Sequence, residues 1–140
     1  MVVDVKTEIT IHASLDKIWT IFTDFDNYPD WNPFIQYVKG PVAVGNIIKV
    51  GIMGMSFKPT VLRFQEKKEF CWKGHFIVPG IFDGEHYFTL QAQLNGSVLF
   101  KHDEKFSGIL IPFFKNLLNN KVKSRYEAMN WKLKELAEQS

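Results

Sequence analysis

The chain has 140 residues, of which 46% are hydrophobic and 15% aromatic, so we expect a single domain over residues 1–140 with a large core. Its formal net charge of +2 is too small to indicate nucleic-acid binding, and its one cysteine, Cys71, excludes an internal disulfide and a cysteine metal cluster. No apolar run reaches the roughly 18 residues of a membrane-spanning helix and the N-terminus lacks a signal-peptide core, so we expect a soluble, cytoplasmic protein.

The N-terminal part predicts one strand followed by two short helices. Apolar and polar residues alternate over residues 3–11, which is the pattern of a half-buried strand. Ser14 stands at the N-cap of a helix whose apolar residues follow at helical spacing: Leu15, Ile18, Trp19 and Phe22. Asp26 or Asn27 can cap a second short helix. Pro33 should end it, because the residue before a proline is pushed out of the α region.

The middle of the chain predicts antiparallel strands separated by turn residues. The expected strands are 35–39, 46–53, 57–66, 69–78, 85–94 and 97–107. The period then changes to that of a long amphipathic helix, with apolar residues at Leu118, Val122, Tyr126, Met129, Leu133 and Leu136. Both apolar faces are buried only if one antiparallel sheet curves around the helix, which predicts an α+β fold.

The order of these elements, together with three motifs, resembles the START/birch-pollen-allergen superfamily, often called SRPBCC. The motifs are FDNYPDWNPFI at 25–35, DGEHYFTL at 83–90 and FKHDEKFSG at 100–108. The chain looks most like the polyketide cyclase/dehydrase-like and lipid-transport-like members, and the resemblance covers nearly all of it. It implies a helix-grip fold, in which a sheet of about seven strands around a long C-terminal helix, with two short helices between strands 1 and 2, encloses a deep apolar cavity.

Three polar residues occupy positions that should face this cavity. In residues 98–106, His102 and Glu104 share the parity of the apolar positions, whereas the opposite parity is mostly charged. His86 likewise shares the parity of the apolar positions in the preceding strand. A three-residue turn over 95–97 would keep the apolar faces aligned and place His86 diagonal to Glu104.

In that register Leu90 pairs with His102 and Phe88 with Glu104.

A histidine–carboxylate cluster in an apolar pocket has three interpretations. It can be a buried structural pair, because a buried carboxylate or imidazole needs a partner. It can recognise the polar end of a ligand whose body the apolar walls hold. It can also be an acid–base catalyst, with candidate catalytic residues His86, His102 and Glu104. The spacing is too generic to indicate a metal site, and we expect no cofactor.

The same reasoning assigns the apolar walls of the cavity. The candidates come from the opening motif, the sheet and the C-terminal helix: Trp31, Phe34, Leu62, Phe64, Trp72, Phe76, Phe88, Leu90, Phe100, Phe106, Leu118, Val122, Tyr126 and Met129. We therefore expect binding of a hydrophobic small molecule or lipid, with transport as an extension of that role. The alternatives are a polyketide cyclase/dehydratase-like enzyme, and a protein-interaction module whose interior is filled by its own side chains.

The segment before the C-terminal helix carries a further signal. Residues Ile109–Phe114 are almost wholly apolar, and between Lys115 and Lys134 there are six basic residues against one acid, Glu127. This is the pattern of a solvated helix face, or of an apolar rim that a basic surface brings to an anionic membrane. No activated nucleophile is indicated, because Cys71 shares its predicted strand face with charged residues.

Overall fold

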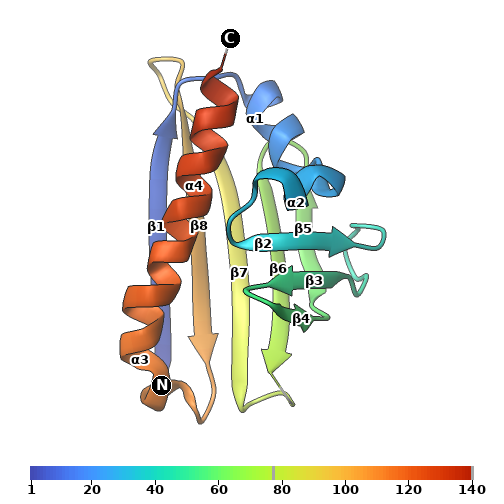
Figure 1. Ribbon diagram of the computed structural model, residues 1–140, viewed down its shortest axis with the longest axis vertical. Coiled ribbons are helices and arrows are strands. Elements are labelled where there is room, and N and C mark those ends of the chain that lie inside the picture. Colours follow the sequence, from blue (N-terminus) through green and yellow to red (C-terminus); the bar gives the residue numbers. More distant parts are fainter. Residues whose placement is uncertain (77, 140) are drawn as a thin grey trace.

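The computed structural model describes residues 1–76 and 78–139 (Figure 1), so Ile77, inside the expected strand 69–78, lies outside the described residues. An antiparallel sheet of five strands runs in the order β1-β8-β7-β6-β5. Its strands are β1 (Val2–Ile11), β5 (Thr60–Gln65), β6 (Glu69–Phe76), β7 (Phe82–Ala92) and β8 (Val98–Ser107). The predicted α+β helix-grip fold is confirmed.

The remaining strands form a separate small sheet, which corrects the expectation of one sheet of about seven strands. Its order is β2-β3-β4, with β2 at Ile35–Lys39, β3 at Lys49–Ile52 and β4 at Met55–Phe57. The expected strand 57–66 is broken at Pro59, because proline has no N–H to donate to the ladder. The two sheets are joined where residues 45–48 run beside residues 59–61, through the bridge between Ile47 and Thr60 and the neighbouring backbone hydrogen bonds.

Two short helices follow β1, as the sequence predicts. Helix α1 (Leu15–Phe22) begins at Ser14, whose hydroxyl accepts a hydrogen bond from the backbone N–H of Lys17. After a single 3-10 turn at Phe25–Asn27, helix α2 (Tyr28–Trp31) ends at Asn32. The buried side-chain oxygen of Asn32 then accepts the backbone N–H groups of the next residues, Phe34 and Ile35. The chain is thereby turned into β2.

The C-terminal helix starts earlier than its apolar stripe suggests. Helix α3 (Ile111–Leu117) continues through a π-helical turn (Leu118–Val122) into α4 (Lys123–Glu138). Figure 1 shows this helical segment running along the concave side of the sheet in front of β1 and β8. The buried face of α4 consists of Tyr126, Met129, Asn130, Leu133 and Ala137.

Aromatic side chains fill the space between the main sheet and the C-terminal helix at the end next to α1. Phe22 of α1 is fully buried, and its ring lies 5.0 Å from that of Phe88, 5.6 Å from Phe100 and 6.3 Å from Phe70. Contacts of this kind add stability beyond the burial of area, typically ~0.5–1.5 kcal/mol for each pair. The cavity of the molecule lies toward the other end, near α3.

The loop between β7 and β8 differs from the expected three-residue turn. Ala92 pairs with Val98, so five residues connect the strands. The backbone N–H of Gln93 donates to the carbonyl of Ser97, and Gly96 donates back to Gln93, which closes the loop. The predicted register was wrong by two residues but kept its parity, so the apolar faces stay aligned.

Candidate functional site

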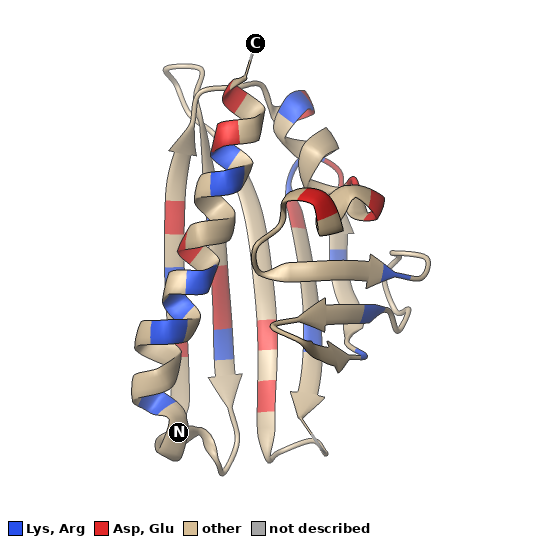
Figure 2. Cartoon of the chain, viewed as in Figure 1, with Lys and Arg blue, Asp and Glu red and all other residues tan. Residues whose placement is uncertain are grey.

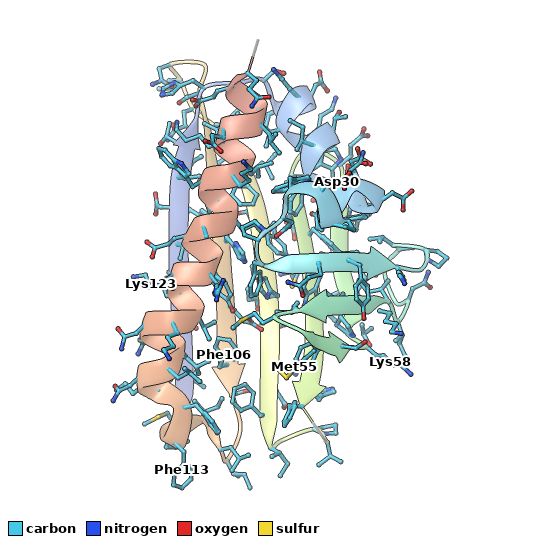
Figure 3. All side chains as sticks on the ribbon, viewed as in Figure 1. Asp30, Met55, Lys58, Phe106, Phe113 and Lys123 are labelled. Atoms are coloured by element: carbon cyan, nitrogen blue, oxygen red, sulfur yellow. The ribbon has the colours of Figure 1, made fainter. Side chains whose placement is uncertain are left out.

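A cavity of about 390 Å³ lies between the concave face of the main sheet, the β3–β4 hairpin and α3. Its lining is predominantly apolar. Met53, Met55, Phe76 and Leu117 line it and are also exposed to solvent, so the cavity opens between the hairpin, the end of β6 and α3. Figure 3 labels Met55 on this hairpin and Phe106 on β8, which is buried deeper on the opposite wall.

The structure brings nine of the seventeen sequence-derived site residues to the cavity wall: Phe34, Trp72, Phe76, His86, Glu104, Phe106, Leu118, Val122 and Tyr126. The other eight do not line it: Trp31, Leu62, Phe64, Phe88, Leu90, Phe100, His102 and Met129. Four of these eight, Phe88, Leu90, Phe100 and Met129, belong to the buried core, and Phe22 of α1 packs on Phe88 and Phe100. Trp31 packs on Tyr28 instead of pointing to the cavity.

Several cavity residues were not predicted from the sequence. They come from the small sheet, from the loop that follows it and from α3: Val50, Ile52, Met53, Met55, Phe57, Pro59 and Leu117. Leu110 and Phe114 also line the cavity and belong to the segment Ile109–Phe114, for which an apolar rim is one interpretation of the sequence pattern. The hairpin residues were missed because the small sheet was expected to extend the main one. Folded over the concave side, β3 and β4 instead form the outer wall of the cavity (Figure 1).

The polar residues of the cavity meet at Glu104. Its Oε1 lies 3.0 Å from Nδ1 of His86 and accepts a hydrogen bond from the hydroxyl of Tyr126. The register explains the first contact, because His86 and Glu104 are directly paired across β7 and β8 rather than diagonal. His86 is 1% exposed, whereas the Glu104 side chain is 12% exposed and faces the cavity.

A chain of hydrogen bonds continues from His86 into the core. Nε2 of His86 lies 2.7 Å from Nε2 of His102, and Nδ1 of His102 lies 2.9 Å from Oδ1 of Asn130. The amide nitrogen of Asn130 donates to the hydroxyl of Thr7 at 2.8 Å. That hydroxyl donates in turn to the backbone carbonyl of His102 at 2.6 Å. Together with Glu104 and Tyr126, six side chains from β1, β7, β8 and α4 thus form one polar chain.

Burial controls the protonation of two members of this chain. Burial, helped by the neighbouring His86, lowers the pKa of His102 well below its ordinary value. Burial, followed by the negative charge and hydrogen bond of Glu104, raises the pKa of Tyr126 well above its ordinary value. The ring of Tyr126 stacks on His102 with centroids 4.4 Å apart and shields it. His102 is therefore neutral at pH 7, and Tyr126 keeps its O–H.

Gly84 makes room for the carboxylate. A Cβ atom at this position would overlap Oε2 of Glu104, which lies directly over the glycine. Oε1 of Glu104 already accepts a hydrogen bond from Tyr126 and lies 3.0 Å from Nδ1 of His86. Oε2 makes no side-chain hydrogen bond or ion pair with the described residues and borders the cavity, so it can accept a hydrogen bond from a bound molecule.

Thr7, Asn130 and Gly84 were not identified from the sequence, although two of them had a signal. Thr7 is the polar residue among the inward positions of residues 3–11, and Asn130 follows Tyr126 by one helical turn. Each is a polar residue on an otherwise apolar face, which requires a buried partner. Gly84 had no such signal, because its importance depends on a side chain of the neighbouring strand.

In the described part of the chain, neither a metal-ligand cluster nor an accessible thiol accompanies the cavity. Among the described residues, no group of three His, Cys, Asp or Glu side chains is arranged to hold a metal ion. Burial raises the pKa of the Cys71 thiol to about 12, and the side chain is 1% exposed, so it is a core residue. His75, at the edge of the cavity, lies 2.9 Å from Asp83 and is held there by it.

Comparisons with known proteins agree with this architecture. The sequence profile of the family described as polyketide cyclase / dehydrase and lipid transport matches residues 2–138. A hypothetical protein from Helicobacter pylori is similar in structure, with a TM-score of 0.82 and 14% identity over 96% of this chain and 88% of that one. A START superfamily protein from Mycobacterium smegmatis has a TM-score of 0.68 and 21% identity over 95% and 98% of the two chains.

A biosynthetic protein shows the same fold. The di-domain ARO/CYC protein StfQ from the steffimycin biosynthetic pathway has a TM-score of 0.78 and 12% identity, over 99% of this chain and 51% of StfQ. At these identities the likeness concerns the fold alone. No curated protein matches the chain by sequence. Across the part of the chain that the structure describes, none of the helices has the length and apolar character needed to span a bilayer.

Proposed function

The chain belongs to the polyketide cyclase/dehydrase and lipid transport family, and on that premise we propose that it binds an apolar small molecule or lipid in its cavity. The observation that carries the proposal is an apolar cavity with one polar cluster in its wall, at Glu104, His86 and Tyr126. Binding sites for small molecules commonly combine apolar walls with a few polar groups that orient the ligand.

The size of the cavity supports a ligand of modest length. Its volume of about 390 Å³ falls in the range of ligand sites, roughly 300–1,000 Å³. At ~30 Å³ for each water-sized group, it has room for about a dozen such groups. Trp72 and Phe34, which stand beside His86 with ring centroids 5.0 and 5.9 Å away, would contact the part of the ligand next to its polar end.

The binding experiment uses a neutral fluorescent probe, N-phenyl-1-naphthylamine, titrated into the protein. We expect saturable fluorescence enhancement that unlabelled apolar molecules reverse by competition. Val122→Trp narrows the cavity and should reduce the probe's affinity by at least ~10-fold, because Val122 is part of the cavity wall. The matched control, Val44→Trp, alters an exposed residue away from the cavity and should bind like the unmodified protein.

An enzymatic role is the alternative function of the same site. The pair formed by His86 and Glu104 could donate and accept a proton beside a bound polyketide-like substrate, as a cyclase or dehydratase requires. The two roles differ in the fate of the ligand. Mass spectrometry after incubation recovers the ligand unchanged from a carrier, whereas an enzyme yields a cyclised or dehydrated product that Glu104→Gln no longer forms.

A second proposal concerns access to the cavity from a membrane. Ile109 and Phe113 are 68% and 81% exposed, next to the cavity residues Leu110 and Phe114. Figure 2 shows several Lys and Arg residues along the lower part of the helical segment. The sequence has Lys115, Lys121, Lys123 and Arg125 there, before the first acidic residue, Glu127. Exposed aromatic side chains beside a basic surface are typical of proteins that touch anionic membranes. We propose that this end of the molecule meets an anionic lipid surface when the cavity is loaded.

A further inference from the structure

The hydrogen-bond chain behind the cavity has a fixed direction, because it ends on an atom that can only accept. The backbone carbonyl of His102 has no hydrogen, so the hydroxyl of Thr7 must donate to it. The Thr7 oxygen is then free to accept only, and the side chain of Asn130 must turn its NH₂ group toward it. The orientation of the Asn130 amide is therefore imposed by its surroundings.

This orientation determines which nitrogen of each histidine carries hydrogen. Oδ1 of Asn130 accepts from Nδ1 of His102, so Nδ1 bears the hydrogen. Buried His102 is neutral, which leaves a lone pair on its Nε2. His86 must consequently donate from its own Nε2 to that lone pair. Thr7 and Asn130, at the far end of the hydrogen-bond chain, thus fix which ring nitrogens of His102 and His86 carry hydrogen.

The fixed positions of these hydrogens affect the contact between His86 and Glu104. If His86 bore hydrogen on Nε2 alone and Glu104 were a carboxylate, two lone pairs would face each other across 3.0 Å. One additional proton removes this repulsion, either on Nδ1 of His86 or on Glu104. In both arrangements the pair holds one shared proton and has no net charge.

We propose that the His86–Glu104 pair keeps this shared proton when a ligand binds, so that the cavity selects an uncharged alcohol or phenol over an amine or a carboxylic acid. The hydroxyl of such a ligand donates to Oε2 of Glu104, the oxygen that lies over Gly84 beside the cavity. This inference rests on the proposed function and names the class of ligand that the same cavity takes.

Charged ligands would have to change the number of bound protons. With an alkylammonium ion bound, the ligand and the pair together are neutral only if the pair releases its proton. That release brings the two lone pairs face to face. A carboxylate repels Glu104 unless the pair gains a second proton. Two titratable groups face the pair, His102 from β8 and Tyr126 from α4. Of the other described residues around the cavity, His75 is titratable and is paired with Asp83.

Thr7 and Asn130 thereby become specificity-determining residues, although neither lines the cavity. In Thr7→Val the threonine hydroxyl is lost, and the Asn130 amide becomes free to turn over. His102 can then carry its hydrogen on Nε2, and His86 can donate from Nδ1 to an ordinary carboxylate. The pair would lose the shared proton and acquire one negative charge, which favours an amine.

Calorimetric titration with octan-1-ol, octylamine and octanoic acid tests the proposal. Measuring each binding enthalpy in two buffers with different ionisation enthalpies gives the number of protons exchanged. For the unmodified protein we expect the alcohol to bind without proton exchange and at least ~10-fold more tightly than the amine or the acid, which corresponds to ~1.4 kcal/mol. In Thr7→Val the amine should gain affinity relative to the alcohol, whereas Thr7→Ser should keep the original order.

Two results distinguish the failure of this inference from that of the proposed function. If all three compounds bind equally well without proton exchange, the charge selectivity is refuted while the binding function stands. If none binds, and N-phenyl-1-naphthylamine does not bind either, the proposed function fails and the selectivity with it. If Thr7→Val does not fold, nitrogen NMR of the unmodified protein shows which ring nitrogen of His102 carries hydrogen. Hydrogen on Nε2 would overturn the proposal.

Discussion

The carboxylate of Glu104 lies directly over Gly84 of the neighbouring strand, so closely that a Cβ atom there would overlap Oε2. Gly84 pairs with Phe106, two residues beyond Glu104, and its bare backbone provides the space in which the carboxylate meets His86 and Tyr126. The polar end of the cavity is thus shaped as much by a missing side chain as by the polar groups themselves.

Replacing Gly84 by alanine should therefore displace Glu104 and weaken binding of octan-1-ol by ~10-fold, about the value of one hydrogen bond. A neutral ligand without a hydroxyl, such as octane, should lose much less. Gly74 is the matched control, because it pairs with Gly84 and lines the same cavity. A Cβ there meets only an ordinary contact with Pro59 at 3.5 Å. Equal losses in both variants would show that the carboxylate has no special role.

The burial of His102 predicts a pH dependence of stability. Its pKa is lowered in the folded protein, chiefly by burial, so the unfolded chain binds more protons below pH ~6.5. The free energy of unfolding should fall as the pH drops from about 6.5 toward the folded-state pKa. The slope contributed by this one group approaches ~1.4 kcal/mol per pH unit.

Urea unfolding at several pH values measures this slope, and His102→Gln removes the group that produces it. The variant should therefore show a shallower decline between pH ~6.5 and 5, whatever its stability at pH 7. Identical slopes for the two proteins would mean that His102 takes up a proton as readily in the folded protein as in the unfolded chain. That outcome would contradict the effect of burial on its pKa, which supports the neutral state used to assign the hydrogen-bond direction.

Cys71 should resist thiol reagents until the protein unfolds. Burial raises the pKa of its thiol to about 12, so little thiolate forms. Only 1% of the residue is exposed, so a reagent can hardly reach it. At pH 8 we expect reaction with a disulfide reagent such as dithiobisnitrobenzoate to be at least ~100-fold slower in the native protein than in urea. Rapid native reaction would indicate that β5 or β6 opens readily.

The apolar surface around α3 should bind anionic vesicles. We expect the unmodified protein to float with vesicles containing phosphatidylserine and to remain in the dense fraction with neutral phosphatidylcholine vesicles. The double variant Ile109→Ser/Phe113→Ser removes the two most exposed apolar side chains of this segment and should abolish flotation.

Trp131 provides a matched control for the flotation experiment. It is 58% exposed on α4, and Trp131→Ser should leave flotation unchanged. Negligible binding of the unmodified protein to both kinds of vesicle would refute access from a membrane. The cavity function would be unaffected, because no residue of the Glu104 cluster is involved.

Much of this architecture could be predicted from patterns along the chain. The alternation around His102 and Glu104 placed both side chains on the inner face, and the structure confirms that placement. Ser14 acts as the helix cap that its position predicts. These features depend on neighbouring residues, and neighbouring residues are what a single sequence displays.

The failed predictions depend on contacts that the alternation of apolar and polar residues does not reveal. The register of β7 and β8 was wrong by two residues because hydrogen bonds inside the loop, between Gln93 and Ser97, decided its length. Phe88 and Phe100 were expected at the cavity, but Phe22 from α1 packs on them. Alternation shows which face a side chain is on, but not which other element covers that face.

The central claim is that the polar end of a ligand binds at Glu104 inside the cavity, and NMR of the isotope-labelled protein with octan-1-ol tests it most directly. We predict saturable shifts at the backbone of Gly84, the indole of Trp72 and the ring of Tyr126, all of which line the cavity. Glu104→Gln should alter the shifts at Gly84 most strongly. Shifts confined to exposed apolar residues such as Phe113 and Trp131, with none at Gly84, would contradict the claim.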